Sequence, residues 1–177
     1  MGLFFYRLIG AAMLDAGMYE GIEADTRTTS QAFAAVLLSS LAAGVGASDW
    51  FGARVTSFAI VSGIAVLTWA AWAMLIHQIG TRLLPGPETE ADWGQLLRTT
   101  GFAAAPGLLQ VFGVVSQARG VVFGVTTAWM FAAMVVGVKH ALDYQSTARA
   151  IVVCGIGLAF AAGLALALAM FLSTGVS

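Results

Sequence analysis

Five long stretches of the chain contain no Lys, Arg, Asp or Glu, and this pattern constrains the fold more than any other feature. The stretches cover residues 28–48, 55–81, 99–118, 120–138 and 150–177. An α-helix needs roughly 20 apolar residues to cross the ~30 Å hydrocarbon core of a bilayer, and each stretch is about that long. Nearly all charged residues lie in the segments between them. The pattern therefore predicts an all-α, polytopic membrane helix bundle with about five transmembrane helices.

The composition agrees with a single membrane domain over residues 1–177. Hydrophobic residues make up 59% of the chain and charged residues only 10%, far from the balance of a soluble domain. We expect the spans at about 28–48, 55–79, 99–118, 120–138 and 150–173. Residues 1–27 are expected to be a cytoplasmic segment with a short interfacial helix. Gly10, Gly17 and Gly21 favour two short helical pieces there over one long helix.

The basic residues fall mainly on one side of the predicted membrane. Six of them lie in the N-terminal segment and in two of the connections: Arg7, Arg27, Arg82, Arg98, Lys139 and Arg149. Only Arg54 and Arg119 lie on the opposite side. Because basic residues concentrate in cytoplasmic loops, we predict a multi-pass protein of the inner (plasma) membrane with a cytoplasmic N-terminus and an outer C-terminus. The net charge of −1, without a polybasic run, argues against a nucleic-acid partner.

The third stretch is the weakest of the predicted spans. Its polar, glycine and proline residues are Thr99, Thr100, Gly101, Pro106, Gly107, Gln110 and Gly113. Only residues 116–120 separate it from the fourth stretch. A re-entrant hairpin over 99–138 therefore stays open as an alternative to two full spans.

The sequence contains no recognisable catalytic or metal-binding pattern. No carboxylate, lysine or arginine lies inside the predicted spans, which disfavours ion-coupled transport. His77 has no second His, Cys or carboxylate at helical spacing, and Cys154 is expected to be a packing residue. We therefore predict no catalytic residue, no metal or cofactor site and no enzymatic activity.

Gln110 and the preceding Pro106-Gly107 pair form a possible broken-helix site. A proline removes one backbone donor and leaves a carbonyl unpaired, and the Gln110 amide, four residues later, could satisfy that carbonyl. The same residues could instead bind a solute at a break in the helix. The structural interpretation is favoured, and the solute site is kept as the alternative.

Small residues recur every four positions along the last two predicted spans. They are Gly120, Gly124, Ala128 and Ala132 in the fourth span and Gly155, Ala159, Gly163 and Ala167 in the fifth. Small residues at this spacing allow helix backbones to approach closely in a membrane. We expect these stripes to pack helices within the chain, with packing against another copy as the alternative.

Two segments resemble the entries to the third and fifth spans of the YIP1 family. These segments are Leu97-Arg98-Thr99-Thr100-Gly101-Phe102-Ala103-Ala104-Ala105-Pro106 and Ala141-Leu142-Asp143-Tyr144-Gln145-Ser146-Thr147-Ala148-Arg149-Ala150. The acidic, threonine-rich segment Ile22 to Gln31 and Trp129 are similar to the bacterial branch of that family. The resemblance implies five spans, a cytoplasmic N-terminus and an outward C-terminus, and it brings no enzymatic residues. Eukaryotic members bind small GTPases in vesicle trafficking, but the N-terminal signature for that role is missing here, so the activity is not carried over.

Three functions are consistent with the sequence. The first is a non-enzymatic membrane-organising or partner-binding protein, whose partners are membrane lipids and either a second copy or another membrane protein. The second is a small pore or carrier for a neutral or lipid-like solute. The third is an accessory subunit of a larger membrane complex.

Overall fold

The described part of the chain consists of helices joined by short turns. The computed structural model describes the backbone of residues 2–47, 55–86 and 92–174, and the side chains of these residues except 55–65, 67, 161–162 and 164–174. Its elements are α1 (Gly2–Ala12), α2 (Ala16–Ala24), α3 (Thr28–Ala47), α4 (Val55–Gln78), the π-helical η1 (Ile79–Leu83), α5 (Trp93–Phe102), the 3-10 helix η2 (Ala105–Val114), α6 (Arg119–Ala141) and α7 (Thr147–Thr174). No strand occurs in these described residues, which confirms the all-α prediction.

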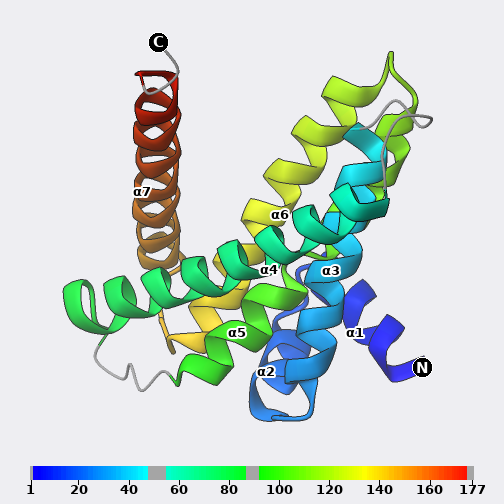
Figure 1. The fold of residues 1–177 in the computed structure, drawn as a ribbon. Helices are drawn as coiled ribbons and strands as arrows, with labels where there is room; N and C mark the ends of the chain where they lie inside the picture. Colours follow the sequence, from blue (N-terminus) through cyan, green and yellow to red (C-terminus); the bar gives the residue numbers. More distant parts are fainter. Residues whose placement is uncertain (1, 48–54, 87–91, 175–177) are drawn as a thin grey trace.

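The elements form a bundle built around η2. Both α3 and α6 pack extensively on η2, and α4 joins the bundle through α3, α5 and α7. In Figure 1, α4 runs across α3 and α6 at a steep angle. The helices α2 and α5 and the α6–α7 turn lie at the lower end of this view, and the end of α7 and the start of α6 lie at the upper end.

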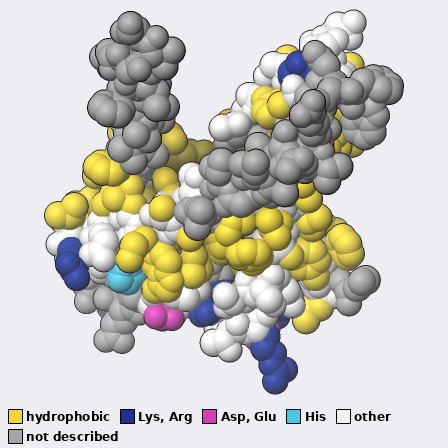
Figure 2. All heavy atoms as spheres, in the orientation of Figure 1, with side chains coloured by type: hydrophobic (Ala, Val, Ile, Leu, Met, Phe, Trp, Pro, Cys, Tyr) yellow, Lys and Arg dark blue, Asp and Glu magenta, His cyan; other side chains and the backbone are white. Residues whose placement is uncertain are grey.

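Two of the described helices, α3 and α6, are long and apolar enough to cross a membrane. Large apolar side chains stand exposed along both, among them Phe33 and Leu38 on α3 and Val121 and Val125 on α6. Figure 2 shows hydrophobic side chains across the middle of the molecule, with most of the visible charged side chains in its lower half. Broad apolar exposure of this kind is expected where a surface contacts lipid. The prediction of about five crossings stays a prediction.

The N-terminal segment consists of two short helices, as the glycines predicted. The break falls at Leu14, whose backbone is left-handed with φ of 61°. The Asp15 side chain then caps α2 by accepting a hydrogen bond from the Met18 amide at 3.2 Å. However, α2 is not a purely interfacial element, because Tyr19 and Ile22 are fully buried against α3 and α5. The segment contributes to the core as well as to the surface.

The stretch predicted as a single third span consists of two elements. The α-helix α5 ends at Phe102, and η2 begins after Ala104 with Pro106 in its first turn. Proline suits this position because the amide it lacks would have no helical partner there. Ten residues of α-helix and ten of 3-10 helix together measure roughly 35 Å. The segment is thus long enough to cross a bilayer, although it is not one α-helix.

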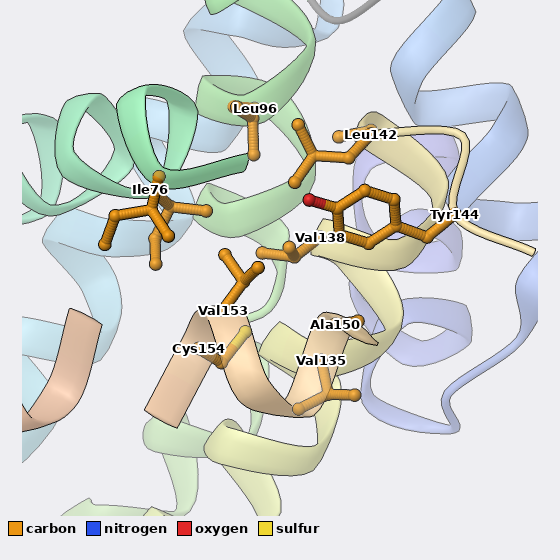
Figure 3. Close-up of a cluster of buried hydrophobic side chains, with 11 residues drawn as sticks. Ile76, Leu96, Val135, Val138, Leu142, Tyr144, Ala150, Val153 and Cys154 are labelled. Atoms are coloured by element: carbon orange, nitrogen blue, oxygen red, sulfur yellow. The ribbon is translucent and has the colours of Figure 1, made fainter. Parts of the chain in front are cut away.

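A buried cluster at the lower end joins α4, η1, α5, α6 and α7 (Figure 3). Ile76, Leu142 and Val153 are among its members, and each exposes at most a trace of surface. The Tyr144 hydroxyl in this cluster donates a hydrogen bond to the Leu84 carbonyl at 2.7 Å and lies 3.1 Å from the Gly80 carbonyl. This contact fastens the α6–α7 turn to the end of η1.

Candidate functional site

The contact between α3 and the α5–η2 segment is unusually close and is made by small residues. On α3 they are Ala32, Ser39 and Gly46, and opposite them stand Gly101, Gly107 and Gly113. We call this set of six residues the glycine seam. A Cβ atom built on Gly101 would lie 2.7 Å from the Ala32 Cβ, and one on Gly46 would overlap the carbonyl oxygen of Gln110. Only glycine permits these approaches.

The spacing within the glycine seam follows from the helix types. The α3 residues are seven positions apart, which is about two turns of α-helix and a rise of roughly 10.5 Å. The opposing glycines are also evenly spaced, six positions apart. From Gly107 to Gly113 this spacing is two turns of the 3-10 helix η2 and a rise of roughly 12 Å, whereas Gly101 lies in the α-helix α5. The two faces therefore stay nearly in register along their length.

A groove of about 1040 Å³ opens beside the glycine seam. It is lined by Val36, Ser39, Ser40, Ala43, Thr68, Trp69, Trp72, Thr100, Ala104, Gln110, Phe123, Gly124, Thr127, Ala128, Met130, Phe131, Met134 and Leu158. These residues come from α3, α4, α5, η2, α6, α7 and the α5–η2 junction. None of them carries a formal charge, so the lining is apolar with a few hydroxyl groups and one amide.

Several polar groups in the groove lining are paired within the protein. The Ser39 hydroxyl donates to the Ala104 carbonyl at 2.7 Å, and the Ser40 hydroxyl donates to the Val36 carbonyl at 2.8 Å. The Thr100 hydroxyl donates to the Leu96 carbonyl and accepts a hydrogen bond from the Trp69 indole at 3.1 Å. These hydroxyl protons are therefore occupied, and the lining presents mainly carbon to the groove.

Gln110 differs from the other polar residues of the groove. Its side chain is buried, with 8% of the residue exposed, and its Nε2 atom lies 3.9 Å from the Met130 sulfur. No other side-chain partner of Gln110 is found among the described residues. The expectation that this amide satisfies a carbonyl freed by Pro106 is thus wrong for the described chain. The local 3-10 geometry instead lets the Gly107 amide donate to the Ala104 carbonyl at 2.9 Å.

The structure separates the predicted site residues into two groups. Pro106 and Gly107 are buried, and Gly107 belongs to the glycine seam, whereas Gln110 lines the groove. The spacing of the seam was present in the sequence but is visible only once η2 is known to be a 3-10 helix. The break at Pro106 was the one available signal for it.

The small-residue stripes do not form close helix contacts at their described glycines. A Cβ atom built on Gly120, Gly124, Gly155 or Gly163 would meet no other heavy atom within 4 Å. Ala128 lines the groove beside Gly124, Ala132 is half-buried and Ala159 is exposed. The Ala167 side chain lies outside the described residues. The expected packing within the chain is therefore absent at the four glycines, and Gly124 and Ala128 of the α6 stripe face the groove.

A second, polar pocket of about 330 Å³ lies where α2 meets α6 and the α6–α7 turn. Glu20, Glu23, Lys139, His140, Asp143, Tyr144 and Gln145 line it. The His140 Nδ1 atom lies 3.6 Å from a Glu20 carboxylate oxygen. Within the described residues, no group of three or more His, Cys, Asp or Glu side chains could hold a metal ion.

Glu23 connects this polar pocket to α5. The buried Arg98 guanidinium donates to the Glu23 carbonyl at 3.0 and 2.6 Å, and the Gln95 amide donates to a Glu23 carboxylate oxygen at 2.9 Å. Burial, and then repulsion from Asp143 and Glu20, raises the pKa of Glu23 to about 7, although Arg98 opposes the shift. The carboxyl group of Glu23 therefore changes charge near neutral pH.

Comparison with known proteins identifies one family. A model of the Yip1 domain matches residues 4–168. The matched range runs from α1 into α7 and contains both the glycine seam and the groove. No curated protein and no solved structure matches the chain.

Proposed function

The chain belongs to the Yip1 domain family, and from that membership we propose that it is a non-enzymatic membrane protein that binds a lipid-like molecule in its groove. The uncharged lining of the groove carries the proposal. A volume of about 1040 Å³ lies just above the roughly 300–1,000 Å³ typical of ligand sites. An uncharged pocket at membrane depth suits an apolar chain, because binding such a chain leaves no charged group buried without a partner.

The proposed topology has five crossings. They are α3, α4, α5 together with η2, α6 and α7, with the N-terminus in the cytoplasm, the C-terminus outside and the inner membrane as the location. Contacts between the predicted cytoplasmic segments support it: the Arg98 guanidinium donates to the Glu23 carbonyl at 2.6 Å, and the Arg149 guanidinium donates to the Pro85 carbonyl at 3.0 Å. The combined length of α5 and η2 favours two full spans over a re-entrant hairpin at 99–138. The bacterial branch of the family is part of the same proposal.

Binding in the groove is testable with lipids that carry brominated acyl chains. Bromine quenches nearby tryptophan fluorescence, and Trp69 and Trp72 both line the groove. Gly124→Leu would extend a side chain into the groove from a position with no neighbouring heavy atom within 4 Å. Quenching by the brominated chain should fall in this variant because the groove is partly filled.

Gly120→Leu is the matched control. Gly120 lies one turn away on the same helix, also has no heavy atom near its Cβ position and does not line the groove. Its quenching should equal that of the wild-type protein. Equal quenching in wild-type, Gly124→Leu and Gly120→Leu proteins would refute binding in the groove.

A second candidate function, that of a partner-binding or accessory subunit, is favoured by the outer face of α6. Gly120 there is flanked by the exposed Val121 and Val125, and small residues beside a β-branched ridge suit contact with another transmembrane helix. Disulfide crosslinking at Val121→Cys would test it, and Gly120→Leu should weaken the crosslink. Partner binding through this face would be contradicted by a crosslink that Gly120→Leu does not weaken. It would also be contradicted if Val121→Cys formed no crosslink with a second copy or with a copurifying protein.

A further inference from the structure

Gln110 is a buried amide that faces an apolar groove with almost no protein partner. Its only side-chain hydrogen bond among the described residues is to the Met130 sulfur, which is a weak acceptor. An amide has two donor hydrogens and an accepting oxygen, and buried groups of this kind are normally hydrogen-bonded. The hydroxyls of Ser39, Ser40 and Thr100 are paired with backbone carbonyls, as described above. The hydrogen-bonding capacity of Gln110 is therefore available to a ligand.

The backbone around Gln110 keeps this amide in place. Its carbonyl lies directly against Gly46, and the Phe123 ring covers the neighbouring Gly113. Residue 110 therefore cannot rotate outward without opening the glycine seam. The backbone of Gln110 is thus held in place, and its side-chain amide reaches the groove wall at Met130.

A second polar group stands on the same wall of the groove. Thr127 lies three residues before Met130 on α6, so the two side chains are neighbours on one helix face. Met130 is also the residue that Gln110 contacts, and Gln110, Thr127 and Met130 all line the groove. Apolar lining residues, including Trp72, Phe131 and Leu158, complete the groove.

We propose that Gln110, with Thr127, binds the hydroxyl group of a neutral long-chain ligand whose apolar chain fills the groove. This inference rests on the proposed function, since it assigns the polar end of the same ligand. A charged headgroup is disfavoured because no lining residue carries the opposite charge, and an isolated charge at membrane depth is costly. A pure hydrocarbon would leave the amide unpaired. A hydroxyl group can donate to the amide oxygen and accept from its nitrogen.

The test compares hexadecanol with hexadecane as competitors of the brominated chain. In the wild-type protein, hexadecanol should displace the probe at about a tenfold lower concentration than hexadecane, the ratio expected from one buried hydrogen bond. Gln110→Met replaces the amide by an apolar group of similar length. In this variant the two competitors should act at nearly equal concentrations, while the affinity for hexadecane stays unchanged. Thr127→Val, at an exposed position that tolerates the change, should reduce the ratio in part.

The outcomes separate this inference from the proposed function. If hexadecane and hexadecanol both compete but Gln110→Met keeps the tenfold preference, Gln110 does not bind the hydroxyl group and the inference is overturned. If hexadecylammonium or palmitate competes better than hexadecanol, the neutral class is wrong. If neither competitor displaces the probe from wild-type protein, groove binding itself fails. Retained elution volume and helical circular dichroism of Gln110→Met exclude misfolding. If Gln110→Met does not fold, the test relies on Thr127→Val, and an unchanged tenfold preference in that variant overturns the inference.

Discussion

Replacing Gly46 by alanine should destabilise the protein by driving α3 away from η2. The added methyl group would overlap the Gln110 carbonyl oxygen, and both contacting groups are backbone, so neither can move alone. Overpacking of a tight interior costs typically 1–3 kcal/mol, and a backbone clash belongs at the upper end of about 3 kcal/mol. Alanine recovers about 0.5–1 kcal/mol through its higher helix propensity. The net expected loss is therefore about 2 kcal/mol.

The assay is thermal unfolding of the detergent-solubilised protein. For a chain of this size, a loss of about 2 kcal/mol corresponds to a fall in Tm of about 4–8 °C. Gly124→Ala is the matched control, because its methyl group would meet no heavy atom within 4 Å. It should keep or slightly raise the Tm, since only helix propensity changes there.

Gly107→Ala provides an intermediate case. Its Cβ atom would lie 3.0 Å from the flexible Met130 sulfur and 3.2 Å from the Ser39 Cβ. These side-chain atoms can shift by a few tenths of an ångström, so the Tm should fall between those of the Gly46 and Gly124 variants. Equal Tm values for Gly46→Ala and Gly124→Ala would refute the reasoning, because the seam would then tolerate a methyl group as easily as an open helix face does.

Two further predictions concern the lower end of the molecule. Glu23 has an ordinary pKa of 4.5 that is raised to about 7, so its contribution to stability is fully present below about pH 4.5 and is lost as the pH rises through 7. Glu23→Gln should remove this part of the pH dependence of Tm between pH 5 and 8, and an unchanged profile would contradict the assignment. Tyr144→Phe should lower stability by about 1–2 kcal/mol because it removes the hydrogen bond to the Leu84 carbonyl. Thermal unfolding would detect this loss, with the exposed Tyr6→Phe as a control that should leave the Tm unchanged.

The sequence was sufficient to predict the helical class and the two-piece N-terminal segment. Hydrophobic stretches and glycines that lower helix propensity are local signals, although the break itself falls at Leu14, between Gly10 and Gly17. The third stretch was harder, because its glycines are spaced by six residues and match no α-helical periodicity. Only the 3-10 geometry after Pro106 brings Gly107 and Gly113 onto one face.

The stripe on α6 illustrates the opposite difficulty. Gly120 and Gly124 have the four-residue spacing of a packing motif, yet both are open in the described chain. Spacing reports which residues share a helix face, but it does not report what lies opposite that face. The partner of a stripe depends on contacts between distant segments, and no local pattern in one sequence encodes them.

The glycine seam and the groove are two sides of one arrangement. Ser39 belongs to both, and Gln110 contacts Gly46 through its carbonyl while its amide lines the groove. The wall formed by α3, η2 and α6 is therefore fixed by close backbone contact. The wall that carries Trp69 and Trp72 belongs to α4, which joins the bundle through α3, α5 and α7. A ligand that fills the groove would lie against the α4 side chains and would leave the seam closed. Binding should consequently alter the fluorescence of these tryptophans while leaving the stability ranking of the seam variants unchanged.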